Sequence, residues 1–171
     1  MNLPSRRIVN FTAFLACAGM MSFALYAEHQ LLMEPCPLCV LQRVAVIGMG
    51  VVFLLLAIHN PGPGWPNRIY LVLLNLAALG GIVVAGRHVW LQSLPPDKVP
   101  SCGPGLDYML ENFPLGDALK QVFSGSGECA EVSWSFIGLS MPAWVLICVA
   151  SLAGVGLWNN LLRMRDQRDQ I

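Results

Sequence analysis

Apolar residues occur in four long runs, separated by polar, proline-rich or glycine-rich segments. The first run holds the twenty uncharged residues 8–27. A helix of that length, at about 1.5 Å per residue, crosses a hydrocarbon core roughly 30 Å thick. Similar runs follow at about 38–58, 69–85 and 143–162. Each run predicts a transmembrane helix.

Glycines within these runs indicate close packing between the helices, because small residues in lipid allow neighbouring helices to approach each other. Six of them lie in the second, third and fourth runs: Gly48, Gly50, Gly80, Gly81, Gly154 and Gly156. We therefore predict an all-α integral membrane protein, a four-transmembrane-helix bundle that forms one membrane domain over residues 1–171.

The composition argues against an ordinary soluble domain. Charged residues make up 12% of the chain and hydrophobic residues 56%, whereas soluble domains are about 25% charged. The ten basic and ten acidic residues cancel. No global excess of charge therefore points to nucleic acid or to an acidic substrate.

The first run has one alternative interpretation, a cleaved signal peptide, because Arg6 and Arg7 precede it. However, the run is longer than the usual apolar region of a signal peptide. In addition, no small-x-small cleavage site ends it near Ala27. We therefore favour a membrane span.

The basic residues beside the runs predict the orientation. Six lie on the side of the two termini: Arg6, Arg7, Arg68, Arg163, Arg165 and Arg168. Three lie on the other side: Arg87, Lys98 and Lys120. The positive-inside rule then predicts cytoplasmic termini, with loops 28–37 and 87–142 outside. In a multi-pass protein of a bacterial inner membrane these loops are periplasmic, where cysteines can persist as disulfides.

The long second outer loop contains one stretch with helical periodicity. Residues 94–105 are rich in proline and glycine, and 124–127 read as a flexible linker. Between them, apolar residues recur at helical spacing in 114–123, which predicts a short amphipathic helix. It either lies flat on the outer leaflet or packs on neighbouring protein. We expect the flanking linkers to leave Cys102 and Cys129 mobile.

The motif Cys36-Pro-Leu-Cys39 immediately before the second run is suited to redox cycling. Its two-residue spacing gives a small, strained disulfide ring, and a helix start offers N–H groups and a positive dipole end to a thiolate. Arg43 follows Cys39 by one helical turn, so its cation would stabilise the Cys39 thiolate. The alternative for Arg43 is snorkelling to the lipid headgroups.

Cys102 and Cys129, twenty-six residues apart, form a second pair in the long loop. From spacing alone we favour a static disulfide staple, worth about 3 kcal/mol in the loop-entropy model, over a substrate-facing disulfide. A zinc site built from all four loop thiolates is least favoured, because structural zinc uses two short-spaced pairs. We therefore predict no metal.

Other polar or sulfur-bearing side chains carry weaker signals. Cys17 and Cys148 lie within apolar runs, where a cysteine behaves as a small hydrophobe in the core. His88 follows the third run, and Gln92 lies four residues later on the same helical face. Both could hydrogen-bond a lipid headgroup or a cofactor carbonyl.

Taken in order, these motifs support a resemblance. The set consists of Cys36-Pro-Leu-Cys39 with Arg43, then Arg87-His88 to Gln92, then Cys102, then Gly-Glu-Cys-Ala at 127–130 with Trp134. It resembles the DsbB family of disulfide bond formation proteins over nearly the whole chain. The resemblance implies an inner-membrane enzyme that reoxidises a periplasmic DsbA-like dithiol oxidase. The two electrons would pass to a membrane quinone, ubiquinone or menaquinone.

The resemblance also implies a role for each cysteine. Cys102 would form the mixed disulfide with the partner, and Cys129 would then attack the Cys36–Cys39 disulfide at Cys36. Cys39 would leave as the thiolate that donates to the quinone. The motif reads Pro-Leu between its cysteines instead of the Val-Leu associated with the best-known member, a departure that bears on its redox potential.

The quinone side of the resemblance involves three further residues. Arg43 would stabilise the Cys39 thiolate and the reduced quinone, and His88 and Gln92 would lie beside the quinone ring.

Two other classes share four spans. A non-catalytic scaffold of the tetraspanin type has a disulfide-bearing loop, but that loop carries a Cys-Cys-Gly motif, whereas Cys102 stands alone before Gly103. A quinone reductase of the vitamin K epoxide reductase type has its Cys-x-x-Cys after the loop pair. Here the motif precedes the pair, which favours the DsbB resemblance.

Overall fold

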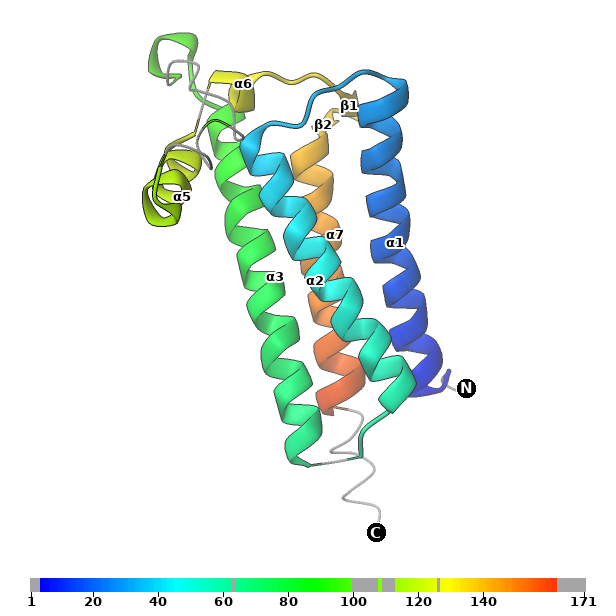
Figure 1. Ribbon diagram of the computed structural model, residues 1–171. Helices are drawn as coiled ribbons and strands as arrows, with labels where there is room; N and C mark the ends of the chain where they lie inside the picture. Colours follow the sequence, from blue (N-terminus) through cyan, green and yellow to red (C-terminus); the bar gives the residue numbers. More distant parts are fainter. Residues whose placement is uncertain (1–3, 63, 100–107, 109–112, 126, 163–171) are drawn as a thin grey trace.

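A computed structural model describes residues 4–62, 64–99, 108, 113–125 and 127–162. Within this part of the chain four long helices run side by side (Figure 1). They are α1 (Arg6–Gln30), α2 (Pro37–His59), α3 (Trp65–Gln92) and α7 (Met141–Leu157), which continues into the π-helix η2 (Trp158–Leu162). All four are long and apolar enough to cross a membrane, so the predicted fold class is confirmed.

The helices extend beyond the predicted spans because local start signals lie outside the apolar runs. Ser5 caps α1 by accepting a hydrogen bond from the N–H of Ile8, and Pro37 occupies the first turn of α2. Both residue types are favoured at these positions. α3 begins at Trp65 and ends at Gln92, well outside 69–85, so it carries His88 and Gln92 on continuous helix.

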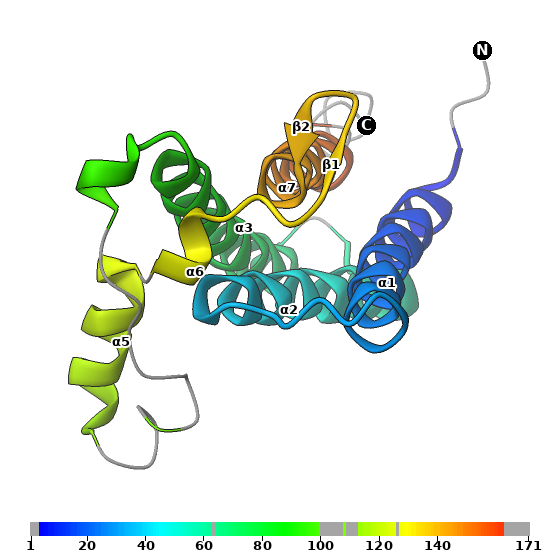
Figure 2. The same cartoon turned by 90° about the horizontal axis from the view of Figure 1, so that it is seen from above.

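The helices pack in sequence order, α1 on α2, α2 on α3 and α3 on α7, as Figure 2 shows from above. α1 and α7 have few mutual contacts. The core between the packed helices contains Phe53, Met49 and Val149, all fully buried, and Cys17 is buried beside them. Cys17 therefore packs in the core, as predicted, while Cys148 is half-buried.

Three of the predicted close-packing glycines, Gly50, Gly81 and Gly156, have a neighbouring atom within 3.2 Å of where a Cβ atom would lie. A Cβ atom at Gly156 would lie 2.5 Å from Cδ2 of Leu74 and 3.1 Å from the Phe53 ring. A Cβ atom at Gly81 would lie 3.2 Å from Cγ1 of Val149. By contrast, Gly80 and Gly154 have open space at this position. Small residues thus bring α7 against α2 and α3 at specific points.

A buried amide network joins the helices at the end where the described chain begins. Asn10 donates to Oδ1 of Asn160 at 3.0 Å, and the amide groups of Asn159 and Asn160 donate to Oδ1 of Asn10 at 3.2 and 2.9 Å. Asn67 donates to the Asn160 carbonyl at 2.8 Å. Hydrogen bonds of this kind hold helices together in lipid, where unpaired amides are costly.

The remaining elements lie at the opposite end of the bundle (Figures 1 and 2). They are η1 (Pro96–Lys98), α5 (Leu115–Ser124), α6 (Gly127–Ala130), β1 (Ser135–Phe136) and β2 (Leu139–Ser140). The two strands pair antiparallel around Ile137 and Gly138, both with positive φ. Two such residues form the turn that suits the twist of a two-residue hairpin.

α5 is the predicted amphipathic helix, and its C-terminal end packs on protein. Val122 is buried in a cluster with Leu91, and the Phe123 carbonyl accepts a hydrogen bond from Nε of Arg87 at 3.1 Å. The helix ends at Gly125, whose φ of 87° suits glycine. Figure 2 shows α5 lying crosswise to the bundle beside α3. Of the two alternatives, packing on neighbouring protein is therefore observed at this end.

Candidate active site

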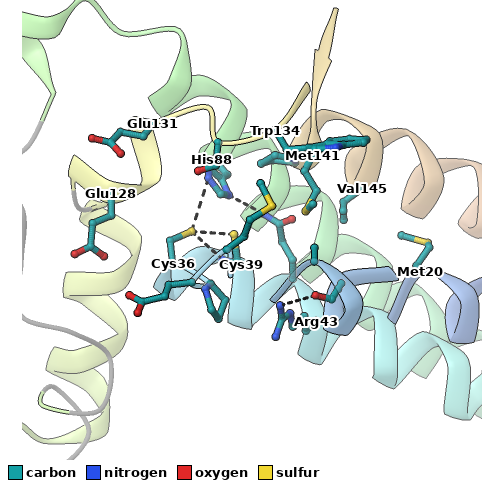
Figure 3. A pocket seen from close by; sticks show the side chains of 18 of the residues that line it. Met20, Cys36, Cys39, Arg43, His88, Glu128, Glu131, Trp134, Met141 and Val145 are labelled. Carbon is teal, nitrogen blue, oxygen red and sulfur yellow. Dashed lines mark hydrogen bonds between the residues drawn. The ribbon is translucent and has the colours of Figure 1, made fainter. Parts of the chain in front are cut away.

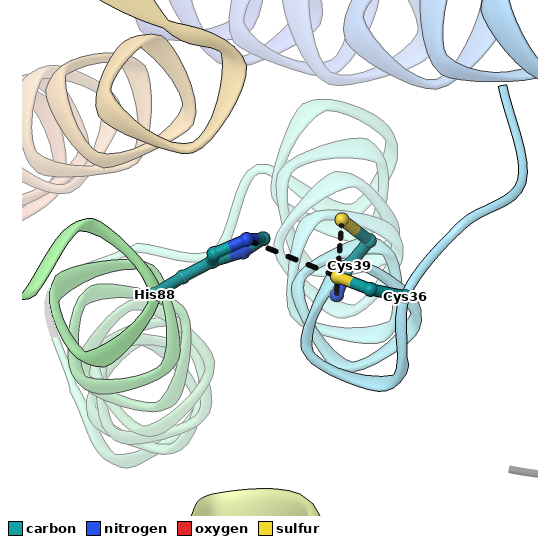
Figure 4. Close-up of side chains that lie close together, drawn as sticks. All are labelled: Cys36, Cys39 and His88. Atoms are coloured by element: carbon teal, nitrogen blue, oxygen red, sulfur yellow. Dashed lines mark hydrogen bonds between the residues drawn. The ribbon is translucent and has the colours of Figure 1, made fainter. Parts of the chain in front are cut away.

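The Cys36–Cys39 pair lies at the start of α2, with both thiols free in this structure (Figure 4). Cys36 is the residue before the helix, and its sulfur accepts a hydrogen bond from the N–H of Cys39 at 3.4 Å. The Cys36 thiol in turn donates to the Cys39 sulfur at 2.9 Å. The motif thus caps its own helix, so the two sulfur atoms are held together in the reduced state.

His88 on α3 faces this sulfur pair (Figure 4). Its Nε2 lies 3.8 Å from the Cys36 sulfur, and its Nδ1 lies 3.0 Å from the amide nitrogen of Gln42 on α2. A Gln42 amide that donates to Nδ1 leaves the imidazole proton on Nε2, facing sulfur. His88 and Gln42 are 3% and 5% exposed, so water does not compete for these contacts.

Cys129 on α6 meets the same cluster. It is 1% exposed and packs with Cys36, Leu38 and Leu91. The prediction that flanking linkers leave it mobile is wrong, because α6 buries it against α2 and α3. Its partner in the sequence, Cys102, lies outside the described residues.

The environment of Cys36 favours its neutral thiol. Hydrogen bonding with Cys129 and then with Cys39, together with burial, raises the pKa of Cys36 above its ordinary value. Cys36 therefore remains protonated next to Cys39, and the pair is asymmetric. In the hydrogen bond between the two side chains, the Cys36 thiol donates and the Cys39 sulfur accepts.

Arg43 reaches across to α1, one turn below Cys39. Its guanidinium pairs with the carboxylate of Glu28 and donates to the Ala24 carbonyl at 3.3 Å. The Arg43 charge is therefore anchored between two helices instead of extending freely to the headgroups. That it stabilises the Cys39 thiolate stays a prediction.

Gln92 lies one turn beyond His88 and has one unpartnered group. Its amide nitrogen is 3.5 Å from the carbonyl oxygen of Glu131. Its Oε1 is buried and has no hydrogen-bond partner among the described residues. A buried acceptor of this kind is costly unless a ligand or water completes it.

These residues line one pocket, whose walls also include residues of α1 and α7 (Figure 3). Cys36, Cys39 and His88 lie toward one end of it, and Met20 and Val145 toward the other. The pocket has about 910 Å³ of space, including its open mouth. Its other lining residues include Arg43, Gln92, Met33, Glu128, Glu131, Trp134 and Met141.

The donor set fits a flat, largely apolar molecule with oxygen atoms at its edge. Methionine, valine and tryptophan side chains supply apolar walls, and Arg43 supplies hydrogen-bond donors. The unpartnered Oε1 of Gln92 accepts a hydrogen bond, so it matches a hydroxyl group, such as that of a reduced quinone. The residues present therefore fit a quinone.

The structure brings together Cys36, Cys39, Arg43, His88 and Gln92, which the sequence singled out. It adds Gln42 and Glu28, which sequence reasoning missed. The signal for both was available: Gln42 is a polar residue inside an apolar run beside Arg43, and Glu28 is the first acidic residue after another run. Neither observation identifies the side chain with which the residue pairs, because that side chain lies on a different helix.

A buried dithiol at a helix start, contacting a third cysteine and opening on a pocket within a membrane bundle, defines a membrane-embedded thiol oxidoreductase. A model of the family described as "Disulfide bond formation protein DsbB" matches residues 6–159. The chain belongs to the DsbB family. The scaffold and vitamin K epoxide reductase alternatives are therefore set aside.

Several relatives are similar over nearly their whole length, and each is named "Disulfide bond formation protein B". One from Methylococcus capsulatus is 52% identical and covers 93% of this chain and 98% of the relative. One from Nitrosococcus oceani is 53% identical over 91% of both chains. One from Acinetobacter baumannii is 50% identical, also over 91% of both chains.

Proposed function

We propose that this protein reoxidises a periplasmic DsbA-like dithiol oxidase by a disulfide relay and passes two electrons to membrane quinone. The observation that carries the proposal is the meeting of Cys36, Cys39 and Cys129 at one end of an apolar pocket inside a membrane bundle. The proposed location is a bacterial inner membrane, with both termini cytoplasmic. Arg6, Arg7 and Arg68, at the end opposite the cysteines, support that orientation.

The relay begins with a thiolate of the reduced partner, which attacks a Cys102–Cys129 disulfide at Cys102. A mixed disulfide forms and Cys129 leaves as a thiolate. The second partner thiol then displaces Cys102, so the partner gains a disulfide and the enzyme gains two electrons. The role of Cys102 rests on the family resemblance alone.

The second exchange moves the electrons to the α2 pair. Cys129 attacks Cys36, forming a Cys36–Cys129 disulfide and releasing Cys39 as a thiolate. The hydrogen bond between Cys36 and Cys129 supports this attack because it already brings the two sulfurs together. Cys102 then attacks Cys129 and displaces Cys36, which restores the Cys102–Cys129 disulfide and leaves Cys36 and Cys39 reduced.

The surroundings of Cys39 suit the thiolate that delivers electrons. Cys39 lies in the first turn of α2, where N–H groups and the helix dipole favour negative charge. A nitrogen of His88 lies within 4.8 Å of its sulfur, and a proton on that side would stabilise the anion. When bound, the quinone supplies a two-electron acceptor.

Arg43 and Gln92 would hold the oxygen atoms of the quinone. Arg43 donates hydrogen bonds, which favour developing negative charge on oxygen, and the Oε1 of Gln92 accepts from a hydroxyl after reduction. Methionine side chains in the pocket lining, such as Met20 and Met141, supply apolar contact for the ring. Turnover measured with ubiquinone and with menaquinone shows which of the two is the acceptor.

A turnover assay with purified protein tests the proposal. Reduced DsbA-like substrate and ubiquinone are supplied, and quinone absorbance is followed for single Cys→Ser variants at positions 36, 39, 102 and 129. We expect all four to lose turnover. Variants Cys17→Ser and Cys148→Ser are matched controls, because these cysteines lie outside the site. Full turnover with Cys102→Ser and Cys129→Ser would instead support a static staple.

A further inference from the structure

Three metal-ligating atoms converge in the reduced site. The sulfurs of Cys36 and Cys39 and an imidazole nitrogen of His88 all lie within 4.8 Å of one another. Thiolates and a neutral imidazole are the ligands that zinc prefers. This set differs from the disfavoured four-thiolate site, because it combines the short-spaced cysteine pair with a histidine from another helix.

We propose that the reduced Cys36–Cys39 dithiol binds one Zn²⁺ ion together with His88, and that the bound ion holds the enzyme out of turnover. The binding itself is independent of the proposed function, whereas its inhibitory consequence rests on it. The oxidised form cannot bind in this way, since its disulfide offers no thiolate. The site would therefore exist only in the electron-loaded enzyme.

The sulfur–nitrogen distance is close to the one that zinc requires, whereas the sulfur–sulfur distance is shorter. With Zn–S bonds of about 2.3 Å and Zn–N bonds of about 2.0–2.1 Å, tetrahedral geometry separates two sulfurs by about 3.8 Å and sulfur from nitrogen by about 3.5 Å. Here the sulfur pair is 2.9 Å apart, and Cys36 sulfur is 3.8 Å from His88 Nε2. The two sulfurs must therefore move roughly 0.9 Å further apart before both can bind one ion.

Gln42 provides the second-sphere contact that a zinc-bound histidine needs. When Nε2 binds the metal, the imidazole proton moves to Nδ1, which must then donate. Gln42 faces Nδ1 at 3.0 Å. Turning its amide over presents Oε1 as the acceptor, and burial of both side chains keeps them aligned.

Among the described residues, three ligand atoms meet in this cluster, so water would be the fourth ligand of a bound ion. Zinc sites with three protein ligands commonly have water in the fourth position. Because Cys39 would be a ligand, the same sulfur could not deliver electrons while the ion is bound. Removal of the ion restores the free dithiol.

Cobalt(II) is the probe for the test, because tetrahedral thiolate coordination gives it intense visible and charge-transfer absorption. Untagged protein is purified in detergent, reduced with a phosphine, desalted without oxygen and titrated with Co²⁺. We expect saturation at one equivalent, loss of the bands on adding Zn²⁺, and no bands in the oxidised protein. Cys148→Ser is the matched control and should bind like wild type.

We expect weaker Zn²⁺ binding in each of three variants, Cys36→Ser, Cys39→Ser and His88→Ala. The loss of affinity should exceed the roughly 10–100-fold that follows from changes to second-sphere residues. Helix content by circular dichroism establishes that each variant is folded. If His88→Ala does not fold, His88→Gln replaces it. The proposed metal site would be wrong if reduced wild type showed no cobalt bands. It would also be wrong if all three variants still bound the metal.

The inhibitory consequence has its own readout. Adding Zn²⁺ to the quinone assay should stop turnover of the wild type, and a chelator should restore it. Undiminished turnover with the ion bound would overturn this half of the proposal. If the wild type shows no turnover even without Zn²⁺, the proposed function fails, while the cobalt spectrum still reports on the site.

Discussion

At the scale of single residues, the site depends on buried or half-buried polar side chains that pair across helices. His88 links α3 to the cysteine pair on α2, and Gln42 fixes the orientation of its imidazole. Arg43 is held by Glu28 from α1. Such buried groups are costly alone and specific when paired, so each one constrains where its helix lies.

Replacing His88 with alanine should slow electron delivery from the cysteine pair. The variant loses the donor that faces the two sulfurs, and loss of one such preorganised donor typically costs about 10²–10³ in rate. Stopped-flow quinone absorbance with reduced partner measures it. His29→Ala, an exposed histidine on α1, is the control and should react at the wild-type rate. An unchanged rate in His88→Ala would remove this histidine from the mechanism.

Replacing Arg43 should lower the rate of quinone reduction by about 10²-fold, because the site loses the cation that faces developing charge on oxygen. Glu28→Gln keeps Arg43 and a hydrogen-bonding side chain, so its loss should be smaller. Initial rates over a range of quinone concentrations separate kcat from KM. Equal activity of Arg43→Ala and wild type would exclude Arg43 as an electrostatic contributor.

The raised pKa of Cys36 predicts a pH-dependent stability of the reduced protein. The folded state holds this proton more tightly than the unfolded chain, whose cysteine titrates near the ordinary value of 9.0. The stabilising contribution is therefore complete below that pH and is lost as pH rises above it. The melting temperature of the reduced protein should be lower at pH 10 than at pH 7. This difference should be larger for wild type than for Cys36→Ser. An equal fall in melting temperature for the two proteins would contradict the raised pKa of Cys36.

At the scale of elements, hydropathy predicted the four spans and periodicity predicted α5, because each pattern lies within one segment. The hairpin β1–β2, the one-turn α6 and the π-helix η2 escaped prediction, since they are too short for periodicity to show. The cysteine pair and His88 could be selected from sequence. The pairing of Gln42 with His88 and of Glu28 with Arg43 could not be predicted, because pairing across helices depends on which faces meet.

Gly154 and Gly156 of α7 provide a test of helix packing, because one of them can serve as the control for the other. Gly156→Ala places a Cβ 2.5 Å from Leu74, and overpacking of this kind costs about 1–3 kcal/mol. Gly154→Ala meets nothing within 4 Å, and alanine is the better helix former. We expect a lower melting temperature in detergent for Gly156→Ala only. Equal melting temperatures would show that α7 packs differently.

At the scale of the whole molecule, the two ends of the bundle differ in chemistry. One end is closed by the amide network around Asn10 and Asn160. At the other end α1 and α7 diverge, and the pocket, the cysteine pair and α6 lie there together. A fixed end and an open end suit an enzyme that receives electrons from outside the membrane and passes them to a molecule within it.

Disulfide mapping tests whether electrons enter the α2 pair at Cys36 from Cys129. Two double variants each leave one partner for Cys129: Cys39→Ser with Cys102→Ser keeps Cys36, and Cys36→Ser with Cys102→Ser keeps Cys39. After mild oxidation, peptide mass spectrometry follows disulfide formation with time. We predict a fast Cys36–Cys129 disulfide in the first variant and a much slower Cys39–Cys129 disulfide in the second. Equal rates, or a faster reaction at Cys39, would contradict this prediction.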